Sequence, residues 1–116
     1  MSKVFDYEKA MKVTAHDSEL TQESITLFRQ QSPQPLHDIG EAVADGDADR
    51  IFRAAHAIKG SLANLGGTVA ACTAAKLETM GRENNITLAA KTLRQLKREV
   101  AEFEEVTADL ERATRP

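Results

Sequence analysis

Three residues in the middle of the chain have types and spacing that suit covalent chemistry. His56, Lys59 and Gly60 stand at positions i, i+3 and i+4, so on a helix they are neighbours on one face. Imidazole is a nitrogen nucleophile that forms covalent intermediates, and Lys59 places a positive charge beside whatever the ring carries. Gly60 leaves open backbone one turn further on. This combination predicts a histidine that carries a phosphoryl group.

The helix that must position these residues is marked by an apolar row at helical spacing. At about 100° per residue, His56 lies roughly 140° from the centre of that row. The imidazole is therefore predicted to face outward, ringed by Phe52, Gly60 and Ala63. The competing interpretation is an ordinary surface histidine with an incidental lysine neighbour. The row consists of Ile51, Ala55, Ile58, Leu62 and Leu65.

Glu78 is a candidate partner for the ring. It lies on the next predicted helix, next to Ala74 and Gly81 and opposite a row that we expect to face inward. If the two helices pack together, Glu78 can accept a hydrogen bond from one ring nitrogen and leave the other free to attack phosphorus. The competing interpretation is a solvated carboxylate paired with Arg82 at i+4. The expected inward row is Val69, Thr73, Leu77 and Met80.

Capping residues divide the chain into helical segments. Ser32, followed by proline at the first helical position, predicts one N-cap, and Gly46 predicts a left-handed helix end. Asp47 is expected to cap the helix that carries His56, and Thr68 to cap the following one. A leading helix is expected over about 5–14, another from 17 or 18 to about 31, and the last carries Ala89, Leu93, Leu96, Val100, Phe103, Thr107 and Leu110 on one face.

Short connections between amphipathic segments predict an all-α protein. We expect an antiparallel up-down-up-down four-helix bundle with one or two additional N-terminal helices. The whole chain, 1–116, is interpreted as a single domain. Its bundle core spans about 33–112 and its N-terminal helical cap about 5–31.

Composition excludes several classes of function. The net charge of −3 is unlike the basic surface that binds nucleic acid. No apolar run has the length of about 20 residues that crosses a bilayer, and the N-terminus does not have the pattern of a signal peptide. The lone Cys72 excludes an intrachain disulfide and is expected to be a small core residue. These features predict a soluble, cytoplasmic domain with no nucleic acid and no membrane insertion.

The sequence resembles the histidine-containing phosphotransfer (HPt) domains of multistep phosphorelays. The His-x-x-Lys-Gly-Ser core is present from His56 to Ser61, and Asn-Leu-Gly follows at 64–66. The resemblance extends to Phe28 before a proline-containing turn, to Ala-Asp-Gly-Asp at 44–47, and to Leu-Glu at 77–78. It covers about residues 5–110, nearly the whole chain.

This resemblance implies a function, partners and site residues. His56 would accept a phosphoryl group from the aspartyl phosphate of a response-regulator receiver domain and pass it to another receiver aspartate. Lys59 would stabilise the phosphoryl charge, Gly60 would give steric access, and Glu78 would orient the ring, a place that holds Gln or Glu in the family. The docking surface is assigned to Phe52, Ala63, Ser61 and Arg82.

The same resemblance implies a phosphocarrier rather than an enzyme, because no ATP-binding module is visible. No cofactor or metal is expected, since the receiver domain would supply Mg²⁺. The partners would be receiver domains, with a hybrid sensor histidine kinase as a further possibility, and the domain is expected to be a monomer.

Three alternatives stay open at this point. The chain is a non-catalytic helical adaptor in which His56 is incidental, or the phosphorylated domain of a chemotaxis-type histidine kinase, which requires a dimerisation and ATP-binding continuation. The third is a metal site formed by His16, His37 and His56. The Glu-x-x-His pairs of di-iron bundles are missing, which disfavours it.

Overall fold

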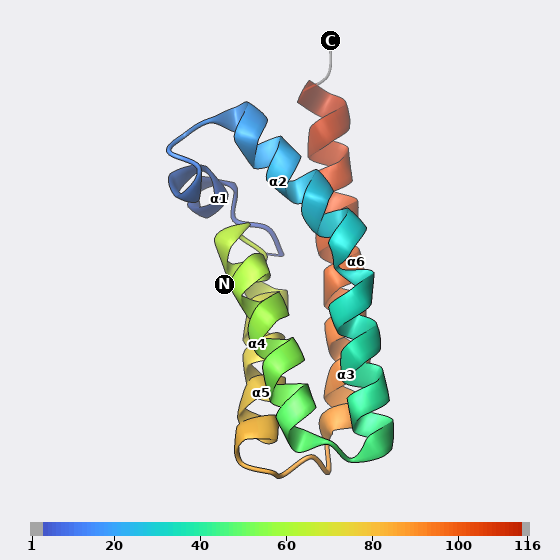
Figure 1. Cartoon of the computed structure of the whole chain (residues 1–116). Helices are drawn as coiled ribbons and strands as arrows, with labels where there is room; N and C mark the ends of the chain where they lie inside the picture. The colour runs from blue at the N-terminus through green and yellow to red at the C-terminus, as the bar shows by residue number, and fades with distance from the viewer. Residues whose placement is uncertain (1–3, 115–116) are drawn as a thin grey trace.

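Four antiparallel helices lie side by side, and two further helices cover one end of them (Figure 1). The computed structural model describes residues 4–114, without the side chains of 110, 111, 113 and 114, and all regular structure in that range is helical. The helices are α1 (Tyr7–Val13), α2 (Ser18–Gln31), α3 (Pro33–Asp45), α4 (Ala48–Asn64), α5 (Thr68–Arg82) and α6 (Ala89–Thr114).

The bundle closes because each of its helices packs against two others. Helices α3, α4, α5 and α6 are neighbours in chain order, and α6 returns to pack against α3. This arrangement confirms the predicted all-α, up-down-up-down bundle with two additional N-terminal helices. The single domain over 1–116 includes residues outside the described range and stays a prediction.

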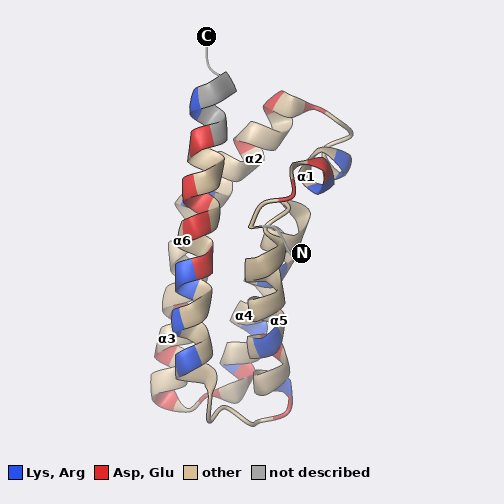
Figure 2. Ribbon diagram, turned by 180° about the vertical axis from the view of Figure 1, so that it is seen from behind, with Lys and Arg blue, Asp and Glu red and all other residues tan. Residues whose placement is uncertain are grey.

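The core includes the predicted apolar rows of α4 and α6, together with buried residues of α2, α3 and α5. Ile51, Ala55 and Ile58 are at most 2 % exposed. The charged residues of α6 are mainly basic in its first half and acidic in its second (Figure 2). Leu110 belongs to the predicted row, but its side chain lies outside the described residues. The confirmed members of the α6 row are Ala89, Leu93, Leu96, Val100, Phe103 and Thr107.

The boundary between α3 and α4 follows the predicted capping signals. Gly46 has φ +67°, the left-handed conformation that glycine adopts without steric cost. The carboxylate of Asp47 accepts a hydrogen bond from the backbone N–H of Arg50 at 3.1 Å, which caps α4. The direction in which α4 leaves this turn decides where His56 points.

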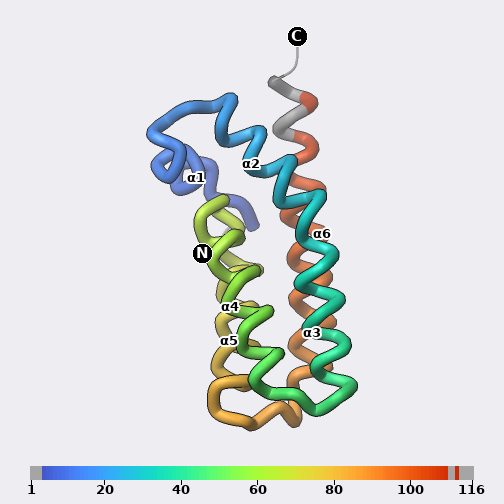
Figure 3. Tube along the Cα trace, in the orientation of Figure 1, coloured from blue at the N-terminus to red at the C-terminus, as the bar shows by residue number. Residues whose placement is uncertain are grey.

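Of two further predicted N-caps, one is confirmed in position and the other is wrong. Ser32 is the N-cap residue of α3 and is followed by proline, as predicted, but it has helical backbone angles and its side chain makes no capping hydrogen bond. Its hydroxyl donates to Glu104 of α6 instead, at 3.0 Å. As a result α2 continues into α3 with little interruption (Figure 3). The N-cap of α5 is Gly67 rather than Thr68, because the Thr68 hydroxyl donates to the carbonyl of Gly66 at 3.3 Å.

The N-terminal segment crosses the turn between α4 and α5. The backbone N–H of Asp6 donates to the carbonyl of Gly66 at 2.7 Å, and Phe5 packs edge-on against Phe103 with centroids 5.7 Å apart. Gly66 has φ +78°, and a Cβ there would lie 2.1 Å from the Asp6 carbonyl oxygen. The glycine of the Asn-Leu-Gly sequence is therefore needed for this crossing. The leading helix is shorter than expected, Tyr7–Val13, since Asp6 caps it.

Candidate functional site

Helix α4 presents His56 to solvent, as predicted. The side chain of His56 is 65 % exposed, while the row on the opposite side of the helix is buried. The ring of Phe52, one turn earlier, stacks on the imidazole with centroids 6.0 Å apart and planes 21° apart. The imidazole is therefore accessible at its outer edge and held on one flank by an aromatic side chain.

The inner edge of the ring contacts a buried carboxylate. Nδ1 of His56 is hydrogen-bonded to Oε2 of Glu78, whose side chain is only 7 % exposed. An ionised carboxylate can only accept, so Nδ1 carries the proton and donates. The lone pair of the neutral ring is then on Nε2, at the accessible edge. This is the tautomer that a phosphoryl acceptor needs.

Two cations, Lys59 and Arg82, also contact this carboxylate. Nζ of Lys59 lies 2.9 Å and Nη2 of Arg82 lies 3.1 Å from Oε1 of Glu78. The hydrogen bond from Lys59, then the one from His56, lowers the pKa of the Glu78 carboxyl below its ordinary value, although burial opposes this. Glu78 is therefore ionised at neutral pH. The interpretation of Glu78 as a solvated carboxylate is wrong, but its predicted pairing with Arg82 is confirmed.

Arg82 also contacts Phe52. Its guanidinium carbon lies 5.7 Å from the centre of the Phe52 ring, within the range of a cation–π interaction. Phe52 therefore contacts both His56 and Arg82. These contacts link the ring, the buried carboxylate and the two cations into one connected cluster across α4 and α5.

The buried face of α5 differs from the predicted one. Val69 and Met80 are only half-buried, and Cys72, expected in the core, is exposed. Thr73 and Leu77 of the predicted row are buried, but so is Glu78, which was expected opposite that row. The buried residues of α5 are Ala70, Ala71, Thr73, Ala74, Leu77, Glu78 and Gly81.

Gly81 sets the separation of α4 and α5 near the site. A Cβ at Gly81 would lie 2.6 Å from the Ala48 carbonyl oxygen and 2.6 Å from the Phe52 backbone nitrogen. Real Cβ atoms do not approach backbone so closely, so the two helices can be this near each other only because residue 81 has no side chain. This close approach brings Glu78 within reach of His56.

The surface beyond the ring is open. A Cβ at Gly60 would meet no atom within 4 Å, and the neighbouring Ala63 is a small, half-buried residue. Ser61 lies on an adjacent face of α4, where its hydroxyl donates to the Ala57 carbonyl at 3.4 Å. A partner molecule can therefore approach His56 along the main chain without displacing side chains.

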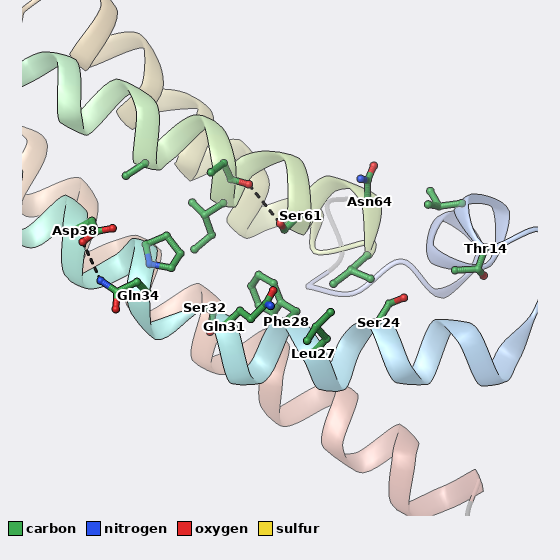
Figure 4. Close-up of a pocket in the computed structure, with 16 residues that line it drawn as sticks. Thr14, Ser24, Leu27, Phe28, Gln31, Ser32, Gln34, Asp38, Ser61 and Asn64 are labelled. Carbon is green, nitrogen blue, oxygen red and sulfur yellow. Dashed lines mark hydrogen bonds between the residues drawn. The ribbon is translucent and has the colours of Figure 1, made fainter.

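An apolar groove runs beside this open surface, between α4 and the α2–α3 helices (Figure 4). It has a volume of about 510 Å³. Leu27 on its wall is 50 % exposed. The groove was not predicted from the sequence; the available signal was Leu27, an apolar residue outside the inward-facing positions of α2. Its walls include Leu27, Phe28, Pro35, Ala57, Ser61 and Asn64.

A histidine metal site is not supported within the described residues. His16 lies in the turn after α1 and His37 pairs with Glu41 on α3 at 3.1 Å, so neither approaches His56. No group of three or more His, Cys, Asp or Glu side chains in this range has the geometry to hold a metal ion. The helices of residues 4–114 also include none that is long and apolar enough to cross a membrane.

Comparison with known proteins agrees with this geometry. The family model of the Hpt domain matches residues 23–106. The chain belongs to the Hpt-domain family. Hpt domains are phosphocarriers of His-Asp phosphorelays, and this is the function class of the chain.

A solved structure shares the fold. The histidine-containing phosphotransfer protein B of Pseudomonas aeruginosa matches with a TM-score of 0.89 and 21 % sequence identity, over 99 % of this chain and 100 % of that one. No curated protein sequence is significantly similar to the chain. At this level of identity the structural match supports the Hpt fold, and it does not assign individual residues.

Replacing Gly81 with alanine should disturb the site, because it disturbs the packing of α5 against α4. We expect Gly81→Ala to lower the free energy of unfolding by about 1–3 kcal/mol, because the new Cβ overlaps the α4 backbone. Gly40→Ala is the matched control, since its Cβ would meet only Leu93, at an ordinary 3.8 Å. Urea unfolding measures both. Equal stability of the two variants would contradict the close approach described for Gly81.

Lowering the pH should reduce the free energy of unfolding, because it protonates Glu78. Because the pKa of this carboxyl is lower in the folded than in the unfolded chain, its contribution to stability is complete above the unfolded pKa of about 4.3 and is lost as the pH falls through the folded value. Glu78→Gln should therefore lose less stability than the parent between pH 6 and pH 3. Urea unfolding at several pH values measures this difference, with the exposed Glu102→Gln as control. A pH profile in Glu78→Gln identical to that of the parent would exclude the assigned role.

Proposed function

We propose that Nε2 of His56 accepts the phosphoryl group of a receiver aspartyl phosphate and passes it to another receiver aspartate. The observation that carries this proposal is the exposed ring whose inner nitrogen donates to a buried, ionised Glu78. The outer nitrogen is thereby left as the nucleophile, and the ring cannot rotate without breaking its bond to the carboxylate.

The chemical step transfers the phosphoryl group from a carboxylate oxygen of the receiver to Nε2 of His56. The Nε2 lone pair forms the new P–N bond while the P–O bond of the acyl phosphate breaks, and its electron pair goes to the departing carboxylate. The proton on Nδ1 stays there, so the phosphorylated ring is an imidazolium stabilised by Glu78. The reverse step, onto a second aspartate, uses the same atoms and returns a neutral ring.

Lys59 supports this step by its charge. Its ammonium group lies on the same face as His56, one turn further along α4, and its side chain is 32 % exposed. Phosphoryl transfer depends chiefly on positioning and on neutralising the equatorial oxygens. We assign that neutralisation to Lys59 on this chain and to the Mg²⁺ of the receiver domain on the other.

The open surface and the groove together form the proposed docking face. Gly60 and Ala63 leave room over the main chain for the receiver's active-site loops. Phe52 and Arg82 border that surface on the α5 side, and Ser61 leads from it into the apolar groove. The exposed Leu27 in this groove fits a partner that covers apolar surface as it brings its aspartate to His56.

The remaining assignments are also proposals. We propose that residues 1–116 act as one monomeric domain in the cytoplasm, without a cofactor of their own, and that their partners are receiver domains, including those of hybrid sensor kinases. The lone, exposed Cys72 fits a reducing compartment. An adaptor with an incidental histidine would not need a buried carboxylate with three hydrogen-bond donors beneath an exposed ring.

Phosphorylation should label His56 alone. Incubation with a phosphorylated receiver domain should give a label that is stable in base and lost in acid, and His56→Gln should remove it because no other described residue combines these contacts. Autoradiography after gel electrophoresis measures the label. A label that persists in His56→Gln places the site elsewhere, and a label obtained only with a chemotaxis-type kinase and ATP would favour that alternative.

Bulk at Gly60 should slow transfer without unfolding the bundle. Gly60→Glu should keep the helical circular dichroism spectrum, since a side chain there meets open space, but should lower the rate of transfer from a phosphorylated receiver by about tenfold or more through bulk and like-charge repulsion. Gly60→Ala is the control and should stabilise α4 by about 0.5–1 kcal/mol. A parental transfer rate in Gly60→Glu would show that the receiver domain does not cover the surface at Gly60.

A further inference from the structure

The buried carboxylate of Glu78 pairs with two cations, Lys59 and Arg82, through the same oxygen atom. One cation would be enough to give that oxygen a partner. Oε2 accepts from His56, and Oε1 accepts from both Lys59 at 2.9 Å and Arg82 at 3.1 Å. A carboxylate oxygen has two acceptor positions, so both cations bind Oε1 together.

In the proposed reaction Lys59 interacts with two anions, one after the other. It pairs with Glu78 in the free protein, and it is assigned to the phosphoryl oxygens once His56 is attacked or loaded. The lysine side chain is flexible and its ammonium is a compact charge, so it can turn from one to the other. Leaving a buried carboxylate oxygen unpaired is costly, and in a site with Lys59 as the single partner of Oε1 this cost would oppose the movement.

The contacts of Arg82 suit it to remain paired with Glu78 when Lys59 moves to the phosphoryl group. It is four residues from Glu78 on the same helix, and its guanidinium lies against the Phe52 ring at 5.7 Å. The planar guanidinium is thus held at two points, on a hydrogen-bond acceptor and on an aromatic face. Lys59, in contrast, pairs only with Glu78 among the residues that the structure describes.

The net charge of the phosphorylated site also favours an arrangement in which Arg82 pairs with Glu78 and Lys59 pairs with the phosphoryl group. A phosphoryl group adds about two negative charges at neutral pH, and the phosphorylated ring gains one positive charge. With Lys59, Arg82 and the ionised Glu78, the phosphorylated cluster has a formal charge close to zero. Without Arg82 it would have an excess negative charge beside a buried carboxylate.

We propose that Arg82 is a positioning residue that retains Glu78 while Lys59 moves from Glu78 to the phosphoryl group. This inference rests on the proposed function of His56 and adds a cation exchange at Glu78 to it. Arg82 acts through Lys59 and does not itself contact the phosphoryl oxygens. The role differs from the docking role assigned to Arg82 from the sequence, because it operates with no receiver present.

The test uses a small phosphodonor, so that receiver docking has no influence. Phosphoramidate phosphorylates the full chain, and the rate at which His56 is loaded is measured for the parent, Arg82→Gln, Lys59→Gln and the double variant. Arg82→Gln should load about tenfold more slowly, and so should Lys59→Gln. The double variant should be within about twofold of the slower single variant, because both changes remove the same contact.

Three comparisons separate this role from others. Arg82→Lys should restore most of the rate, because it returns a cation to Oε1, and the exposed Arg98→Gln should load at the parental rate. A parental rate in Arg82→Gln would overturn the proposal. So would single-variant losses that multiply in the double variant, since they would show that Arg82 acts independently of Lys59.

A second readout follows Lys59 directly. The ¹⁵Nζ resonance of Lys59 should shift when the parent is phosphorylated and should shift much less in Arg82→Gln, where the ammonium stays on Glu78. Equal shifts in the two proteins would overturn the proposal even if the rates differ. A parent that phosphoramidate and phosphorylated receivers both leave unlabelled at His56 would instead contradict the proposed function, which keeps the two failures distinct.

Discussion

The structure of the site depends on one buried charge. A carboxylate removed from water is tolerated only when donors surround it, and Glu78 meets this requirement with contacts from two helices. The same bonds fix the tautomer and direction of the His56 ring, position the two neighbouring cations and tie α4 to α5. An arrangement that stabilises an ion in the interior thus also prepares an imidazole for chemistry at the surface.

The bundle provides the geometry that this ion needs. Small residues on α5 allow α4 to come close, and at Gly81 the helices approach so nearly that a methyl group would overlap backbone. The Asp47 cap and the buried row of α4 set the rotation of that helix, so one face enters the core and another carries His56. The N-terminal segment, fastened at Gly66, closes the far end of the pair.

Much of this was predictable, and the failures have identifiable causes. Hydrophobic periodicity predicted the bundle and the outward direction of His56, because both follow from the spacing of apolar residues along single helices. The Thr68 cap was wrong, and Ser32 occupies the predicted N-cap position without a capping side-chain bond, because each hydroxyl donates to a different acceptor, in one case 72 residues away. Cys72 was misplaced because an alanine-rich helix gives a weak signal of which face is buried.

The sequence by itself determined the family, the phosphocarrier class and the accessible histidine beside a lysine and a glycine, since these depend on residue types and on short helical spacings. Only the tertiary structure decided that Glu78 is buried and ionised, that Arg82 shares its oxygen with Lys59, and that a groove adjoins the site. The physical reason is that burial and ion pairing between α4 and α5 depend on how closely two helices approach. That distance is set by side-chain volume at the contact, at Gly81 above all, and not by the pattern along either helix.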